Sequence, residues 1–452
     1  NLNFSNLKFE ILSLIICLNG YWITEARAQE TPFTLEESVS YALENNAEAR
    51  NARLEIEAAR GLVGERTAEG LPQINANLNA TNNLMVPVSP FPARIFDPEA
   101  AEGEFIGIQF SPEFTAGLTG TVSQMIFNGS YFIGLKAAKT YRQLAEVDRK
   151  LTELEVIENV KKAYYSVLVS GEREELIRAN LSRIDTLLKE TKILYDEGFA
   201  EKIDVSRIQV QHNNIQTELD KAKTATLVSM RLLKFQMGMP QSQEITLVDT
   251  ITGLETLLDA ERLLLEDGEQ RVEIDQVNTN YDLATLDLKN NQIQYMPRLD
   301  ANYTFQRNAF GGNFSNLWSG DWFTGSVVGV TLQIPIFDGF TKRYKIQQNR
   351  VQLRQLEVQK ESVLQNIVIE KFQSRQNLIN SLKALDVQRE NRDLALEVFD
   401  MAKIKYQEGV GSNLEVVEAD SALKEAETNY FSALYDAFIA KVDLEKALGI
   451  LK

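Results

Sequence analysis

Few residues in this chain could carry out covalent chemistry. It has one histidine, His212, and one cysteine, Cys17, which excludes a Cys or multi-His metal site and disfavours His-based catalysis. We therefore expect no enzyme activity, no cofactor and no resident metal. Among the carboxylates, Glu415 and Glu418 are three residues apart at the start of a predicted helix, so they share one face. A helix N-terminus favours negative charge, so an ordinary solvated helix start explains this pair.

The helix that must hold this pair belongs to a set of very long predicted helices. The longest covers residues 340–408, a stretch without glycine or proline. At a rise of 1.5 Å per residue, it would be about 100 Å long. Its apolar residues recur every three or four positions, as at Leu378, Leu382 and Leu385, which is typical of a helix that packs lengthwise against others. Such a helix cannot bury its apolar stripe alone, so the sequence predicts a coiled-coil-like bundle.

The chain also contains an internal duplication. LPQI at 71–74 recurs as MPRL at 296–299, QMIFNG at 124–129 as IPIFDG at 334–339, and YDEG at 195–198 as YQEG at 406–409. Each copy predicts a helix, a strand pair, a very long helix, a glycine turn and a shorter helix. The expected division is a signal peptide (1–28), a first repeat (29–240), a connecting segment (241–268) and a second repeat (269–452). The predicted helices are 35–68, 131–197 and 203–237 in the first copy, and 270–295, 340–408 and 414–448 in the second.

The predicted strands alternate between apolar and polar residues. This holds for residues 74–80 and 299–305, and less clearly for their expected partners, 115–126 and 323–334. Side chains on a strand point to opposite faces in turn, so one face of the sheet is apolar and the other polar. In water the apolar face would cover a core. In an outer membrane it would contact lipid, and the polar face would line a water-filled lumen.

Aromatic residues gather at the start of the last strand. Trp318, Trp322 and Phe323 fit the girdle of aromatics at a membrane interface, and a core cluster is the alternative. Spanning barrels have at least about eight strands, more than the two predicted pairs supply. A chain of this kind that spans a membrane must therefore share strands with copies of itself, and symmetric closure gives a ring.

The N-terminus predicts a secreted protein. An apolar run at 11–18 is too short to span a membrane, and Ala26-Arg27-Ala28 has the small-x-small pattern of a signal-peptidase site. We expect cleavage after Ala28. Lipidation of Cys17 is disfavoured because Ile16 stands where a lipoprotein signal requires a small residue. The remaining chain has no apolar run long enough to span as a helix, and a net charge of −17 disfavours nucleic acid as a partner.

Together, the signal peptide, the duplicated order of elements and the two Tyr-x-x-Gly turns resemble the outer membrane efflux protein family, the TolC-like outer membrane factors. The resemblance implies an α+β homotrimer with a long periplasmic α-barrel. Each protomer would add four strands to one twelve-stranded transmembrane β-barrel, and the termini and the connecting segment would form an equatorial domain. Such proteins are passive ducts of tripartite efflux or type I secretion systems. The implied partners are outer membrane lipid, a periplasmic adaptor and an inner-membrane pump of the RND, ABC or MFS type.

The same resemblance implies roles for individual residues. Glu415 and Glu418 would form two acidic rings at the periplasmic aperture, where they attract cations and repel anions. Asp204 and Tyr406 match the residues that latch the aperture closed. The family's usual arginine is replaced here by Gly411, which predicts fewer closing bonds. Independently of the resemblance, Gly198 and Gly409 are expected to adopt positive φ as helix C-caps.

One alternative is a trimeric coiled-coil fibre or adhesin of the cell envelope. A fibre would keep heptads through one uninterrupted rod and would not need two copies of an alternating strand pair. The sequence leaves the cargo open between drugs, metal ions, siderophores and proteins.

Overall fold

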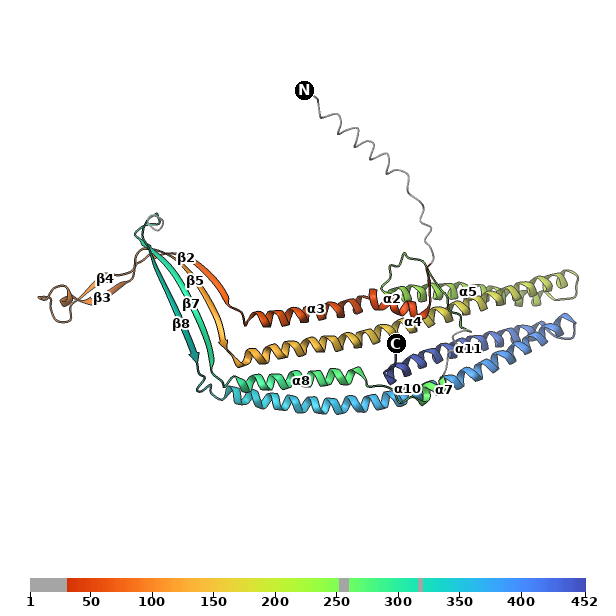
Figure 1. The fold of residues 1–452 in the computed structure, drawn as a ribbon. Helices are drawn as coiled ribbons and strands as arrows, with labels where there is room; N and C mark the ends of the chain where they lie inside the picture. Colours follow the sequence, from red (N-terminus) through yellow and green to blue (C-terminus); the bar gives the residue numbers. More distant parts are fainter. Residues whose placement is uncertain (1–30, 252–259, 316–319) are drawn as a thin grey trace, which may run out of the picture. The chain divides into compact units, whose positions relative to one another are not determined.

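The structure, a computed structural model, describes residues 31–251, 260–315 and 320–452, and its elements are labelled in Figure 1. The predicted signal peptide with Cys17, and Trp318, lie outside these residues. The predicted bounds of the four longest helices are confirmed to within two residues at each end. The helices are α2 Leu35–Asn45, α3 Ala47–Ala68, α4 Gly129–Asp196, α5 Lys202–Met237, α7 Ala260–Leu265, α8 Val272–Ile293, α10 Thr341–Gln407 and α11 Asn413–Leu448. The strands are β1 Thr31–Phe33, β2 Gln73–Asn82, β3 Val88–Pro92, β4 Phe105–Gln109, β5 Phe114–Phe127, β6 Ile245–Leu247, β7 Arg298–Gly311 and β8 Trp322–Gln333.

The prediction of one helix over residues 35–68 is wrong, because the chain breaks at Asn46. This residue leaves the helical region, with φ −57° and ψ 139°. Its Oδ1 accepts a hydrogen bond from the Glu48 N–H at 2.8 Å, and its Nδ2 donates to the Gln236 carbonyl at 2.8 Å. Asparagine competes for backbone hydrogen bonds in this way, and here it ends α2 and caps α3. A capping box of Thr34 and Glu37 opens α2.

The chain divides into two compact units that do not follow the sequence repeats. One unit contains residues 148–274 and 363–452 with the N-terminal stretch up to Arg53, and the other contains 54–147 and 275–362. The long helices α4 and α10 each begin in the second of these units and end in the first. Each unit therefore takes elements from both repeats. Within the described part of the chain, no helix is both long enough and apolar enough to cross a membrane.

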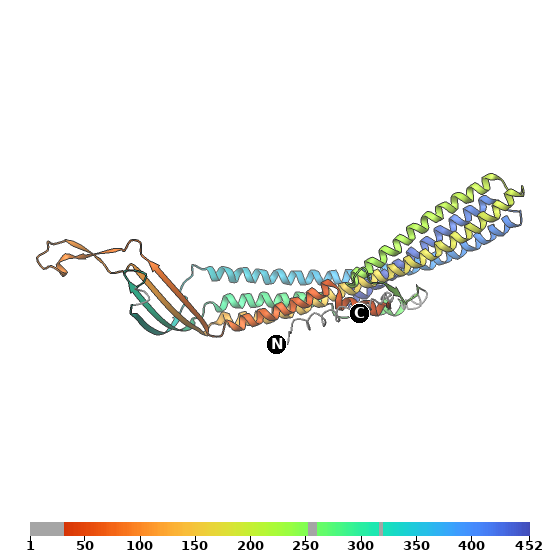
Figure 2. The same ribbon diagram turned by 90° about the horizontal axis from the view of Figure 1, so that it is seen from above.

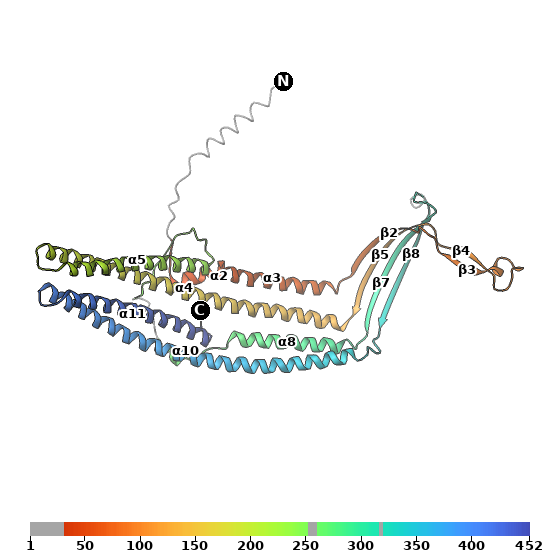
Figure 3. The ribbon, with the colours of Figure 1, turned by 180° about the vertical axis from the view of Figure 1, so that it is seen from behind.

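The first unit contains two antiparallel helical hairpins. The C-terminal part of α4 pairs with α5, and the C-terminal part of α10 pairs with α11 (Figures 1 and 3). Figure 2 shows these four helix segments running together, with both turns at the same end. We call this assembly the hairpin bundle. One cluster of buried side chains joins the four helices and includes Ile184, Ile208, Phe399, Val416 and Leu423.

Segments far apart in the sequence meet at the base of this bundle. The N-terminal strand β1 pairs in parallel with β6 of the connecting segment, and α7 packs on α11. Tyr164 of α4 is fully buried, and its hydroxyl donates to Asp249 Oδ2 at 2.7 Å. Burial, together with this carboxylate, raises the pKa of Tyr164. The sequence did not predict β1, β6 or α7, because each is too short to show a periodic pattern.

The second unit contains a four-stranded antiparallel sheet in the order β2-β5-β7-β8. Both expected strand pairs are confirmed, and β5 with β7 joins them. Between β2 and β5, the strands β3 and β4 form a separate hairpin. The sequence did not predict this hairpin, because its residues Ser89-Pro90-Phe91-Pro92 carry two prolines. On the sheet, β2 and β8 are the two edge strands.

The register of the sheet confirms one apolar and one polar face. One cross-strand row consists of Ile74, Val122, Tyr303 and Val328. The row that faces the opposite way consists of Asn77, Thr119, Gln306 and Gly325. Ile74 and Val328 are 76 % and 77 % exposed, so nothing in the described chain covers the apolar row at either edge.

Candidate functional site

The predicted site residues gather at the two turns of the hairpin bundle. Gly198 follows α4 with φ 82°, and Gly409 follows α10 with φ 74°. The predicted positive φ of both glycines is therefore confirmed. The residue after each glycine donates its N–H to a carbonyl in the last turn of the helix: Phe199 to Leu194 at 2.8 Å, and Val410 to Lys405 at 3.0 Å. These bonds define the Schellman motif, in which a left-handed residue satisfies helix carbonyls that would otherwise lack a partner.

Gly411 has a steric reason to be glycine. A Cβ at this position would lie 2.8 Å from the Lys405 Cβ and 3.1 Å from the Lys405 carbonyl carbon, which is too close for an unstrained contact. The Gly411 N–H donates to the Lys405 carbonyl at 2.9 Å, which holds the two segments together. The turn in this conformation therefore leaves no room for an arginine at 411. This geometry explains why glycine stands at 411 instead of the arginine that is usual in the family.

Glu415 and Glu418 lie in the first turns of α11, as predicted. Both are exposed, and they share one face of the helix. Ser412 is the N-cap residue, and its hydroxyl accepts a hydrogen bond from the Glu415 N–H at 3.2 Å. Both carboxylates are therefore available to the solution or to neighbouring copies, and the partial positive charge of the helix start favours them.

The structure does not bring Asp204 and Tyr406 together within one chain. Asp204 Oδ2 accepts from the Glu201 N–H at 3.2 Å and so closes the start of its own helix, α5. The Tyr406 hydroxyl lies 3.4 Å from Thr191 Oγ1 on α4, which is a contact between the two hairpins. A second contact follows next to it, since Gln407 Nε2 donates to Glu190 Oε2 at 3.2 Å. The bonds that join the hairpins at this end therefore involve Tyr406 but not Asp204.

The tip of the bundle presents apolar side chains to the solvent. Phe199 is 83 % exposed and Val410 is 79 % exposed, one in each turn. Ile203 and Leu414, at the starts of α5 and α11, are also exposed. Exposed apolar side chains grouped in one place commonly mark an interaction site.

The predicted interface aromatics lie on opposite faces of the sheet. Trp322 lies in the apolar-face row with Ala80, Ala116 and Ala309, and the Arg307 guanidinium lies over its ring at 5.7 Å. Phe323, the next residue, lies on the polar face, because neighbouring residues of a strand alternate. Of these two residues, only Trp322 therefore lies on the sheet face that the sequence predicts to contact lipid.

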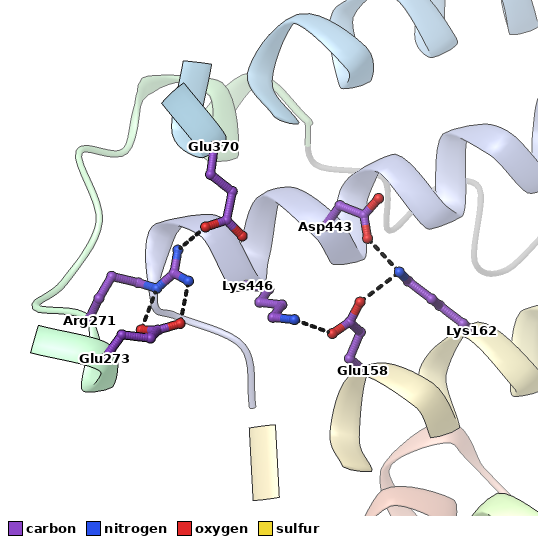
Figure 4. A network of polar contacts seen from close by, with 7 residues as sticks. All are labelled: Glu158, Lys162, Arg271, Glu273, Glu370, Asp443 and Lys446. Atoms are coloured by element: carbon purple, nitrogen blue, oxygen red, sulfur yellow. Dashed lines mark hydrogen bonds and ion pairs between the residues drawn. The ribbon is translucent and has the colours of Figure 1, made fainter. Parts of the chain in front are cut away.

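A network of charged side chains, which the sequence did not predict, ties α4 to α11 in the first unit (Figure 4). Glu158 of α4 accepts from Lys162 at 2.7 Å and from Lys446 of α11 at 2.6 Å, and Lys162 also pairs with Asp443 at 2.6 Å. Burial alone would raise the pKa of Glu158, but the two lysines outweigh burial and lower it. No sequence pattern indicates the ion pairs between α4 and α11, because residues 158–162 and 443–446 are far apart along the chain.

A second part of the network centres on Arg271, just before α8 (Figure 4). Arg271 is buried, and its guanidinium contacts both carboxylate oxygens of Glu273, Glu370 on α10 and the Ala447 carbonyl. Burial alone would lower the pKa of Arg271, and the two glutamates reverse that effect. This side chain therefore joins the start of the second repeat to α10 and to the end of α11. Within the described residues, no group of three or more His, Cys, Asp or Glu could hold a metal ion.

Solved structures with this fold include outer membrane channels. The outer membrane protein VceC of Vibrio cholerae matches with a TM-score of 0.67 at 17 % identity, over 92 % of this chain and 96 % of that one. At this identity the likeness shows the fold alone. The open sheet, the long helices and the paired hairpins are therefore the protomer fold of this class.

The sequence comparisons identify the family. The model described as "Outer membrane efflux protein" matches residues 39–238 and 268–450. The Vibrio cholerae outer membrane protein TolC is 22 % identical over 425 residues, covering 92 % of this chain and 91 % of TolC. The pyoverdine export outer membrane protein OpmQ of Pseudomonas aeruginosa is 22 % identical over 430 residues, covering 92 % of this chain and 85 % of OpmQ. The chain belongs to the outer membrane efflux protein family and is an outer membrane protein.

Proposed function

We propose that this chain forms the outer membrane duct of an export system. Three copies would share their strands in one β-barrel of twelve strands, and their helices would form a periplasmic tunnel. The observation that carries the proposal is the open sheet β2-β5-β7-β8, which has two edge strands and an exposed apolar face. Unpaired strand edges are unfavourable in water and in lipid, and pooling strands between copies removes the free edges. An uncovered apolar row is unfavourable in water but favourable against lipid.

The polar and apolar faces of the sheet fit a lipid-facing cylinder around a water-filled lumen. Ile74, Val122, Tyr303 and Val328 would contact acyl chains, with Trp322 at the headgroup level. The polar row that contains Asn77 and Gln306 would line the lumen. A fibre or adhesin would not need this alternation, and family membership also argues against it.

We expect an inner-membrane pump to drive export and an adaptor to dock on the hairpin tips. The exposed Phe199 and Val410 support docking there, because their burial against a partner would be favourable. We propose small molecules or proteins as the cargo. Two relatives carry cargo names of different chemistry, pyoverdine for OpmQ and toluene for the Pseudomonas putida protein TtgF.

The acidic pair should set the ion selectivity of the duct. The double variant Glu415→Gln, Glu418→Gln is expected to lower the preference for cations over anions severalfold, because it removes two rings of charge from the narrow end. The measurement is the reversal potential in a planar bilayer under a salt gradient. Glu397→Gln, at an exposed site near the C-terminal end of α10, is the control. Unchanged selectivity in the double variant would place the acidic pair outside the conduction path, and no channel activity at all would contradict the proposed function.

Asp204 and Tyr406 are proposed to help hold the aperture closed. Tyr406→Phe removes the hydroxyl that contacts Thr191, and Asp204→Ala removes the carboxylate from the start of α5. One hydrogen bond contributes about 0.5–1.5 kcal/mol, so Tyr406→Phe should raise the open fraction by about two- to tenfold. The Asp204 hydrogen bond lies within the start of α5, so a latch role for Asp204 requires that its carboxylate also binds a neighbouring copy, and the same rise is then expected for Asp204→Ala. Single-channel conductance in a planar bilayer measures this. No increase in either variant would count against a latch role for that residue.

A further inference from the structure

Helix α11 carries a heptad pattern with two acids in its core positions. The buried residues of its inner face are spaced alternately by four and three positions, which is the pattern of a coiled-coil seam. Apolar residues normally fill such a seam, and here Asp420 and Glu427 stand in it at 2 % and 5 % exposure. The row consists of Val416, Asp420, Leu423, Glu427, Tyr430, Leu434 and Ala437, all of them buried.

Both acids make hydrogen bonds to the other hairpin. Asp420 Oδ2 accepts from Gln211 Nε2 on α5 at 2.8 Å. Glu427 Oε2 accepts from Asn180 Nδ2 on α4 at 2.8 Å, and Asn180 is itself 4 % exposed. The two carboxyl groups therefore lie in the contact between α11 and the α4–α5 hairpin. They join the hairpins through neutral amide donors.

The charges around the two acids compensate only part of the cost of burying them. From α4, Arg183 Nη2 lies 3.8 Å from Glu427 Oε1, and the same guanidinium lies over the Phe399 ring of α10 and donates to Asn180. Lys424 of α11 pairs with Glu218 of α5 and also lowers the pKa of Asp420. Arg392 of α10 lies over the Tyr430 ring and lowers the pKa of Glu427, whereas the neighbouring charge of Asp420 raises it. His212 of α5 faces Asp185. Burial raises the pKa of both Asp420 and Glu427, and it outweighs the nearby positive charges.

We infer that Asp420 and Glu427 make the packing of the two hairpins proton-sensitive, so that the hairpins pack most tightly when both carboxyl groups are protonated. Separation of the hairpins would hydrate the carboxyl groups and return each pKa to its ordinary value. Between the ordinary and the raised pKa, the packed form binds more protons than the separated form. The packed form therefore becomes more stable, relative to the separated form, as the pH falls toward about 4. It becomes less stable as the pH rises through the raised pKa values of the two carboxyl groups. If the hairpins surround the periplasmic end of a duct, which rests on the function proposed above, acid solution narrows that end.

The test measures the distance between the two hairpin tips in the full chain. Spin labels are placed at Phe199→Cys and Val410→Cys, with Cys17→Ser to remove the native thiol. The labelled chain is diluted with unlabelled chain, so that each assembly contains at most one labelled copy. Distance distributions from double electron–electron resonance are compared at about pH 5 and about pH 8, because the packed form becomes more stable as the pH falls toward about 4. Asp420→Asn and Glu427→Gln, singly and together, mimic the protonated forms, and the exposed Glu425→Gln on the same helix is the control.

The unchanged protein and Glu425→Gln should show more of the long-distance population at the higher pH. The ratio of separated to packed tips should change by up to about tenfold for each unit by which burial raises a carboxyl pKa. The double variant should keep the short distance at both pH values, and each single variant should lose part of the response. If the double variant does not fold, the single variants decide the question.

Two outcomes overturn the inference. One is a tip distance in the unchanged protein that does not depend on pH. The other is a pH response in the Asp420 and Glu427 variants as large as in the unchanged protein. Conductance in a planar bilayer separates this inference from the proposed function. A conducting channel with pH-independent tips overturns the inference alone, whereas pH-responsive tips without conductance overturn the proposed function alone.

Discussion

Replacing Arg271 with methionine is expected to lower the free energy of unfolding by about 3 kcal/mol, the lower end of the range for breaking a buried ion pair. The Arg271 Nε and Nη2 lie 3.0 Å and 2.5 Å from the Glu273 carboxylate, and Nη1 lies 3.1 Å from Glu370. The variant leaves these acids and the Ala447 carbonyl without their donor (Figure 4). The lower end applies because the Glu370 side chain is 42 % exposed and water can solvate it.

Two further variants make this test specific. Arg271→Lys keeps the charge but loses the planar fork that reaches Glu273 and Glu370 together, so an intermediate loss is expected. Arg262→Met removes an exposed pair with Glu266, and exposed pairs contribute about 0–1 kcal/mol. The measurement is denaturant unfolding in detergent at equal protein concentration. A loss for Arg271→Met no larger than that for Arg262→Met would show that the buried guanidinium does not stabilise this region.

Gly238→Ala is expected to destabilise the chain more than the equivalent change in the second repeat, Gly449→Ala. Both glycines end a helix in the left-handed region, with φ 71° and 75°, so both substitutions cost about 1–2 kcal/mol in backbone strain. A Cβ at 238 would also lie 2.4 Å from the Asn45 carbonyl oxygen and 2.8 Å from the Asn46 Cα. At 449 the nearest atom, the Glu269 carbonyl oxygen, is 3.4 Å away.

The overlap at 238 involves backbone atoms, which cannot move aside as a side chain can. We therefore expect an additional loss of about 1–3 kcal/mol in Gly238→Ala, as for other overpacked sites. The same unfolding measurement compares the two variants, and each serves as the control for the other. Equal losses would mean that the close approach of residues 45 and 46 to α5 does not exist in solution.

The sequence predicted most of the helices and the sheet, because their signals repeat over many residues. The long stretch 340–408 and the alternation at 74–80 and 299–305 each contain several periods, and glycines mark the helix ends at 238 and 449. Features that extend over only a few residues give no such repeated signal in the sequence. The break at Asn46 depends on one side chain that bonds both to its own backbone and to Gln236.

In the candidate site, the sequence predicted the features that depend only on residues close together along the chain. The helix start that carries Glu415 and Glu418 and the left-handed Gly198 and Gly409 follow from neighbouring residues. Contacts between the hairpins depend on three-dimensional packing, so the Tyr406 contact with Thr191 could not be inferred from residue types. The buried Asp420 and Glu427 did carry a signal, since they interrupt the apolar heptad of α11, but acids on long helices are usually solvated.

Copies of this chain are expected to pool their strands, and disulfide trapping between the edge strands measures this pooling. Within one sheet, β5 and β7 separate β2 from β8 by three strand spacings, about 14 Å, so a disulfide between the edges can form only between copies. Asn77→Cys on β2 is combined in turn with single cysteines along β8, in a chain that carries Cys17→Ser. The outer membranes are then oxidised, and covalent products are separated by size. The account predicts that at least one combination gives dimers and closed trimers. Only monomers throughout the β8 scan would contradict it.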